Sequence, residues 1–168
     1  MDRPVKDDVK IYHIYLGRNE KGKTITMVGW GDTGKAGDRK AKRGGGSLRE
    51  ARNRILDNKD GVLEYRFDGP KDDTFDNEGL SWAGDSGGPA FIFDEGDFRI
   101  AGVNSGGDCC GYGSVDQYKR LADAFDWIAN VVSDDGKQIP GEVGKGSDFA
   151  CTGGKGGDRK GRDDKDDH

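Results

Sequence analysis

The stretch Gly84-Asp85-Ser86-Gly87-Gly88-Pro89 decides the fold of this chain. A serine with glycines on both sides lies where the backbone turns tightly and leaves room for another molecule, because glycine tolerates the positive φ values that such a turn requires. The amides of Gly84 and Ser86 could then point into one concavity and act as an oxyanion hole, which is the largest single contribution to acyl-transfer catalysis. We therefore predict that Ser86 is a nucleophile.

The same residues also match G-x-S-x-G, the nucleophile elbow of the α/β-hydrolases. An elbow requires a helix directly after the serine, whereas Gly87, Gly88 and Pro89 are poor helix formers and an apolar β-like run follows them. The elbow also needs a histidine downstream, and the only one there is His168, the last residue of a charged tail. A strand after Pro89 is the better interpretation.

A second motif lies upstream, Met27-Val28-Gly29-Trp30-Gly31-Asp32-Thr33-Gly34. Together the two motifs resemble the C-terminal half of a trypsin-like (chymotrypsin-fold) serine endopeptidase. The resemblance implies an all-β fold, a six-stranded antiparallel barrel with a C-terminal helix, over residues 1–132. Residues 133–168 are rich in glycine and charge, and we predict a disordered tail there because such a composition cannot repay the entropy of folding.

Composition limits the partners of the chain. Only 32% of its 168 residues are hydrophobic while 35% are charged, so the buried core is small. The net charge of −5 is made of interleaved signs, which argues against nucleic acid and anionic membranes as partners. No stretch is long enough to span a membrane, and the first residues lack the apolar core of a signal peptide. The disulfide state of Cys109, Cys110 and Cys151 cannot be read from their spacing.

Local patterns predict most of the elements. Residues 10–16 and 24–30 are rich in β-branched and aromatic types and predict two strands joined as a hairpin. Residues 61–68 alternate as a half-buried strand, and 91–93 with 98–103 predict a second hairpin. Apolar residues at helical spacing predict a helix from about residue 121 to 132.

Residues 47–56 give conflicting signals. Ser47-Leu48-Arg49-Glu50 has the spacing of a helix capping box, and the apolar residues after it recur at helical intervals. The resemblance instead implies a strand of the barrel at this position. We follow the resemblance, since tertiary pairing often overrides local propensity.

The resemblance also assigns a role to Asp85. In this family the new amino terminus formed by zymogen cleavage binds this carboxylate, and the ion pair shapes the oxyanion hole. The chain contains no candidate for that terminus. Because a carboxylate without a partner is costly to bury, we expect Asp85 to stay solvated or to deform its loop.

A serine hydroxyl needs a base to become nucleophilic, and in this family an acid-oriented histidine is that base. His13 lies in an alternating apolar segment and is predicted to be a strand histidine, not a catalytic one. The family's catalytic histidine and aspartate belong to the N-terminal barrel, which would precede Met1. We expect the chain to be about half of the enzyme, and a truncated record to be the more economical explanation of its start.

The resemblance implies a substrate pocket with three walls, at residues 79–83, 104–107 and 113–118. Leu80 stands where trypsin has its floor aspartate, so a preference for Arg or Lys does not carry over. Asp116 could restore that charge or could be a surface carboxylate, and both interpretations stay open. Trp82 stands where most of the family has a cysteine staple. The predicted pocket residues are Leu80, Ser81, Ser105, Gly107 and Asp116.

The function implied is that of a secreted serine endopeptidase, which cleaves proteins or peptides through an acyl-enzyme on Ser86. Its partners would be the substrate and the missing N-terminal barrel. We expect no cofactor and no metal: residues 29–36 miss a phosphate-binding loop by one residue, and the acidic clusters lack calcium-loop spacing. The alternatives are a non-catalytic trypsin-like domain that binds protein and a broken gene product without activity.

Overall fold

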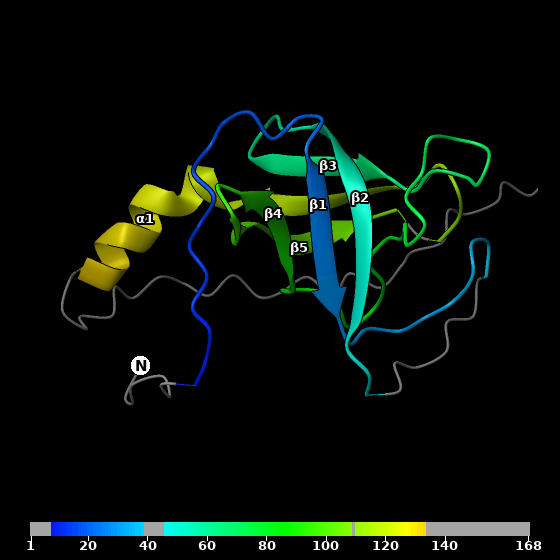
Figure 1. Cartoon of the computed structure of the whole chain (residues 1–168), viewed down its shortest axis with the longest axis horizontal. Helices are drawn as coiled ribbons and strands as arrows, with labels where there is room; N and C mark the ends of the chain where they lie inside the picture. Colours follow the sequence, from blue (N-terminus) through cyan, green and yellow to red (C-terminus); the bar gives the residue numbers. More distant parts are fainter. Residues whose placement is uncertain (1–7, 39–45, 109, 134–168) are drawn as a thin grey trace, which may run out of the picture.

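The computed structural model describes residues 8–38, 46–108 and 110–133. Six strands form a closed antiparallel barrel in the order β1-β2-β3-β6-β5-β4, and one helix follows the last strand (Figure 1). The elements are β1 (Thr24–Gly29), β2 (Arg49–Asp57), β3 (Val62–Arg66), β4 (Pro89–Asp94), β5 (Asp97–Gly107), β6 (Val115–Arg120) and α1 (Leu121–Ser133). The expected all-β fold with six strands and a C-terminal helix is therefore confirmed. The predicted tail lies outside the described residues.

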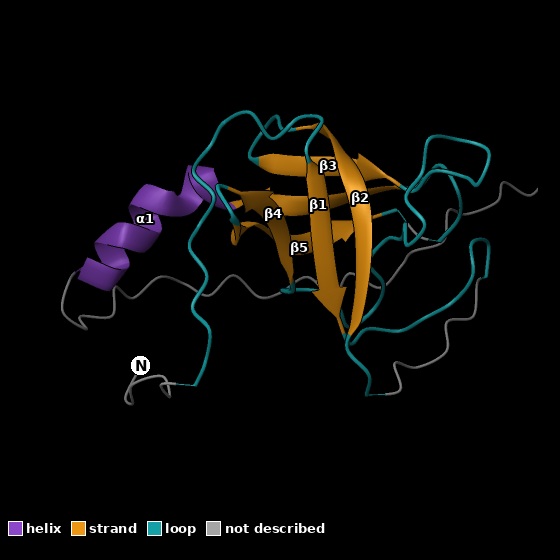
Figure 2. Cartoon of the chain, viewed as in Figure 1, coloured by secondary structure: helices purple, strands orange, loops and turns teal. Residues whose placement is uncertain are grey.

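The barrel interior is filled by alternate residues of the strands, as the two-residue period of a strand requires. Nine of these side chains and Tyr15, from the segment before β1, form one buried cluster, of which Tyr65, Ile25, Leu63 and Ile92 are almost wholly inaccessible. Within the described part of the chain, α1 is neither long nor apolar enough to cross a membrane. Figure 2 shows α1 extending from one side of the barrel, with the segment before β1 running on that same side.

Residues 49–57 form a strand, as the resemblance implied, despite the local helix signal. β2 pairs with β1 over six consecutive residues and with β3 on its other side. Its burial alternates along most of its length, which buries Asn53 and Ile55 completely. Pairing on both edges therefore overrides the local preference.

The predicted hairpin of residues 10–16 with 24–30 is wrong. Both edges of β1 are taken, by β2 and β4, and the earlier segment makes only one bridge, between Ile14 and Ile100 of β5. Ile100 can make this bridge because β6 pairs with β5 only from Gly102 onward. The sixth strand is instead Val115–Arg120, which the sequence patterns did not predict.

The predicted hairpin around residues 94–97 is confirmed. β4 and β5 are joined by Glu95 and Gly96, which both have positive φ values of 50° and 87°. Two consecutive positive φ values define the tight turn whose twist matches paired strands. This turn lies at one end of β4, and the serine motif lies at the other.

Candidate functional site

The serine motif forms the turn directly before β4. Gly84 and Gly87 have φ values of +94° and +82°, which are unfavourable for other residues. A Cβ atom on Gly84 would lie 3.2 Å from Gly31 Cα, so the turn also needs the smaller residue for space. The Ser86 side chain is exposed at the tip. The glycines thus do what the motif suggested, which is to present a serine on a tight turn.

The end of the turn next to β4 is hydrogen-bonded to β5. The Gly87 amide donates to the Asn104 carbonyl at 3.1 Å, and the Asn104 amide donates to the Gly88 carbonyl at 2.9 Å. Among the described residues, by contrast, the amides of Gly84 and Ser86 donate no hydrogen bond. The two predicted oxyanion donors are therefore available to a ligand.

The Asp85 residue is half-buried. It turns inward, where the Gly31 amide donates to Oδ1 at 2.7 Å and the Trp82 amide donates to Oδ2 at 3.0 Å. A Cβ atom on Gly29 or Gly31 would come within 3.0 Å of this carboxylate. The expectation for Asp85 assumed that the carboxylate has no partner, whereas two backbone amides satisfy it, that of Gly31 in the Gly-Trp-Gly motif and that of Trp82 just before the serine motif. Asp85 of the serine motif therefore requires glycine at positions 29 and 31 of the upstream motif.

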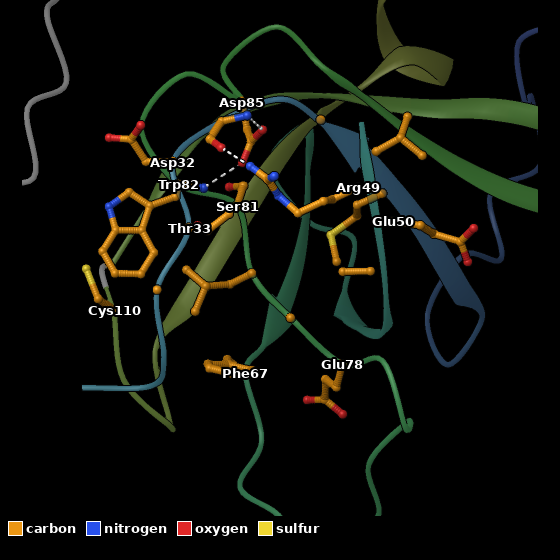
Figure 3. A pocket seen from close by; sticks show the side chains of 18 of the residues that line it. Asp32, Thr33, Arg49, Glu50, Phe67, Glu78, Ser81, Trp82, Asp85 and Cys110 are labelled. Carbon is orange, nitrogen blue, oxygen red and sulfur yellow. Dashed lines mark hydrogen bonds between the residues drawn. The ribbon is translucent and has the colours of Figure 1, made fainter. Parts of the chain in front are cut away.

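A pocket of about 220 Å³ lies beneath Asp85, between the end of β1, the start of β2 and residues 78–82 (Figure 3). Four carboxylates and two cations line it, together with apolar side chains. The charged residues are Asp32, Glu50, Glu78, Asp85, Lys35 and Arg49. The pocket is therefore suited to a ligand that carries a positive charge beside an apolar group.

Arg49 is a member of this pocket that the sequence did not single out. Its Nη2 donates to the Gly31 carbonyl at 2.6 Å. The alternation of β2 places Arg49 on the same face as Ala51, Asn53 and Ile55, which points toward the barrel interior. Once residues 47–56 are assigned to a strand, that alternation would have predicted an inward arginine.

Asp116 is buried, with only 2% of its surface exposed, so it is not a surface carboxylate. The Tyr65 hydroxyl donates to Oδ2 at 2.7 Å, and both the amide and the hydroxyl of Ser81 bind the same oxygen. Burial raises the pKa of Asp116, although these hydrogen bonds act in the opposite direction. Burial and the nearby Asp116 charge also raise the pKa of Tyr65 well above its ordinary value.

The five predicted pocket residues do not all line the pocket beneath Asp85. Leu80 and Ser81 line it, whereas Ser105, Gly107 and Asp116 do not. Gly107 pairs directly with Asp116 across β5 and β6, and a Cβ atom on Gly107 would clash with the Asp116 backbone. The second and third predicted walls are thus packed against each other.

His13 is an exposed residue far from Ser86. Its carbonyl accepts a hydrogen bond from the Ile100 amide at 2.8 Å. His13 therefore lies beside Ile100 of β5, whereas the serine motif is hydrogen-bonded to Asn104 of the same strand. Four residues of strand separate Ile100 from Asn104, roughly 13 Å at 3.3 Å per residue. His13 is therefore out of reach of the Ser86 hydroxyl.

The remaining features singled out in the sequence are the acidic clusters and the cysteines. Among the described residues, no group of three or more His, Cys, Asp and Glu side chains could hold a metal ion. Cys110 is disulfide-bonded and lines the pocket beneath Asp85, while Cys109 and Cys151 lie outside the described residues.

The family is defined by sequence as well as by fold. The sequence profile of the family described as Trypsin matches residues 2–128. The chain therefore belongs to the trypsin family. Comparison with curated protein sequences gives no significant match.

Two solved structures illustrate the shared fold. A mutant of human heparin binding protein is 24% identical, with a TM-score of 0.58 over 82% of this chain and 57% of that chain. Neuropsin, a serine protease expressed in the limbic system of mouse brain, is 19% identical, with a TM-score of 0.58 over 77% of this chain and 56% of that one. The chain thus spans somewhat more than half the length of either structure.

Proposed function

We propose that this chain is the C-terminal part of a secreted serine endopeptidase in which Ser86 forms the acyl-enzyme. The observation that carries the proposal is the serine turn: an exposed Ser86 beside two backbone amides, of Gly84 and Ser86, that no other described group uses. Membership of the trypsin family supports the same chemistry.

In the proposed reaction, Ser86 Oγ attacks the carbonyl carbon of the scissile peptide bond while its proton passes to a histidine. The oxyanion formed accepts hydrogen bonds from the amides of Gly84 and Ser86. The histidine then gives its proton to the leaving amine, and water hydrolyses the acyl-enzyme after losing a proton to the same base. Because His13 is out of reach, the histidine and its orienting aspartate would come from an N-terminal barrel of a longer protein.

The pocket beneath Asp85 fits this proposal. Its excess of carboxylates and its apolar wall suit an apolar amino-terminal residue, whose ammonium group would approach Asp85. The resemblance implies such a terminus, produced by cleavage of a zymogen. In the structure the carboxylate holds the Gly31 and Trp82 amides, so the pocket is already organised around it.

The alternative is a non-catalytic domain that binds protein through the same surface. It is favoured by one observation, the distance of His13 from Ser86 among the described residues. The two proposals differ in what precedes Met1 in the gene. A reading frame that continues upstream into a histidine- and aspartate-bearing barrel supports the peptidase, and an in-frame stop codon shortly before Met1 supports the binding domain.

A fluorophosphonate probe of serine nucleophiles tests the proposal on the protein. The isolated chain should be labelled barely above its Ser86→Ala variant, because loss of a triad base costs several powers of ten in rate. The extended protein should be labelled strongly, and its Ser86→Ala variant should not be. An extended protein with both catalytic residues that resists the probe would refute the peptidase.

A further inference from the structure

Arg49 lies on the inward face of β2 at the mouth of the pocket, as a half-buried cation. In the part of the chain that the structure describes, it forms no ion pair and donates its hydrogen bond to a carbonyl, that of Gly31. The exposed Arg52 and Arg54 of the same strand each lie within 4.0 Å of a carboxylate. Of the three arginines of β2, Arg49 is therefore the one that forms no ion pair with a surface carboxylate among the described residues.

Gly31 connects Arg49 to Asp85. Its carbonyl oxygen accepts from Arg49 at 2.6 Å, and its amide donates to Asp85 at 2.7 Å. Figure 3 shows the Arg49 side chain extending across the pocket toward the Asp85 carboxylate. The two opposite charges therefore bind the same residue, Arg49 through the Gly31 carbonyl and Asp85 through the Gly31 amide.

We infer that the Arg49 guanidinium has two roles in the pocket beneath Asp85. It holds Gly31 against Asp85, and it competes with an incoming amino terminus. It is a positioning residue, since it acts on the serine turn through Gly31 and Asp85 and touches no reacting atom. The inference rests on the proposed function, in which an amino terminus enters this pocket. It adds that the chain keeps Asp85 in place before any such terminus arrives.

The charge of the pocket supports competition. Its lining has two more carboxylates than cations, and Arg49 is the cation that binds the carbonyl of Gly31, the residue whose amide binds Asp85. An ammonium group that enters must share the carboxylate field with this guanidinium and is repelled by it. Neutralising Arg49 should therefore strengthen ammonium binding, and keeping the charge in a lysine should not.

The first test measures binding of a tripeptide of one valine and two glycines, with a free amino terminus, by NMR titration of the folded chain. Arg49→Gln should bind it roughly five- to tenfold more tightly than wild type, the effect of about one unit charge at close range. Arg49→Lys should bind as wild type does. The matched control is Arg54→Gln, which removes a charge from the exposed face of β2 and should change nothing. The N-acetylated tripeptide should not bind.

The second test measures amide hydrogen exchange at Gly31 and Trp82, the two donors to Asp85. Exchange at both should be at least tenfold faster in Arg49→Gln, should return toward wild type in Arg49→Lys, and should be unaffected by Arg54→Gln. Unchanged exchange together with equal peptide affinity in wild type and Arg49→Gln would overturn the inference. If no variant binds the peptide but exchange responds to Arg49, the positioning role stands and the amino-terminal activation in the proposed function fails.

Discussion

A buried ion pair between Glu20 and Arg120 joins the segment before β1 to the end of β6. Replacing Arg120 should lower the free energy of unfolding more than replacing Glu20. Glu20 and Arg120 have side chains that are 1% and 6% exposed. Their two contacts measure 2.7 and 3.0 Å. The hydrogen bond to Glu20 raises the pKa of Arg120 further, so the guanidinium is charged at every accessible pH.

Arg120→Met would leave the Glu20 carboxylate buried with one remaining donor, the Asn58 amide at 2.7 Å. Removing one partner of a buried pair costs about 3–5 kcal/mol. Glu20→Gln would leave Arg120 with Asp123, whose oxygens lie 3.1 and 3.2 Å away and which is partly exposed. That loss should be only about 1–2 kcal/mol.

Urea unfolding, followed by circular dichroism and tryptophan fluorescence, measures both losses. With a slope of about 1.5 kcal/mol per M, Arg120→Met should lower the midpoint by about 2–3 M and Glu20→Gln by about 1 M. Lys10→Met is the control, because it removes an exposed pair with Asp97 and should leave the midpoint unchanged. A larger effect of Glu20→Gln than of Arg120→Met would refute the reasoning.

Three further predictions concern other parts of the molecule. Gly31→Ala should destabilise the chain by about 2 kcal/mol in urea melts, because the new Cβ would displace the Asp85 carboxylate. The loss should be smaller when the same substitution is made in an Asp85→Ala variant, and equal losses in both would contradict this reasoning. Burial raises the folded-state pKa of Asp116 above its ordinary 3.8, so its contribution to stability is present in acid and is lost as pH rises through the folded pKa. The stability of Asp116→Asn relative to wild type should therefore rise as the pH increases above 3.8, and a flat difference would show that Asp116 does not carry this penalty. The isolated chain should bind a hydrophobic dye through exposed side chains such as Phe93 and Phe98, and Phe93→Ser should weaken that binding; a cooperative monomeric melt without dye binding would argue against an exposed apolar face.

Much of the fold could be predicted from local rules. The serine turn, the strand after it, the hairpin around residues 94–97 and the helix depend on φ preferences and on periodicity, which act between neighbours in the chain. For residues 47–56 the local signal pointed to a helix, and the resemblance supplied the strand. Among site residues, the exposed Ser86 on its glycine turn was predicted correctly in geometry, while its catalytic role stays a prediction.

The sequence by itself determined where the chain turns and which segments are apolar, because these properties belong to single residues and short repeats. Only the tertiary structure decided β6, since its inward side chains are Asp116, Tyr118 and Arg120, and two charges among three positions hide the usual apolar alternation. Tertiary structure also decided the partners of the charged groups. Asp85 meets Gly31, Arg120 meets Glu20 and Asp116 meets Tyr65 across separations of 51 to 100 residues, and such pairs form only when barrel closure brings distant segments to one place.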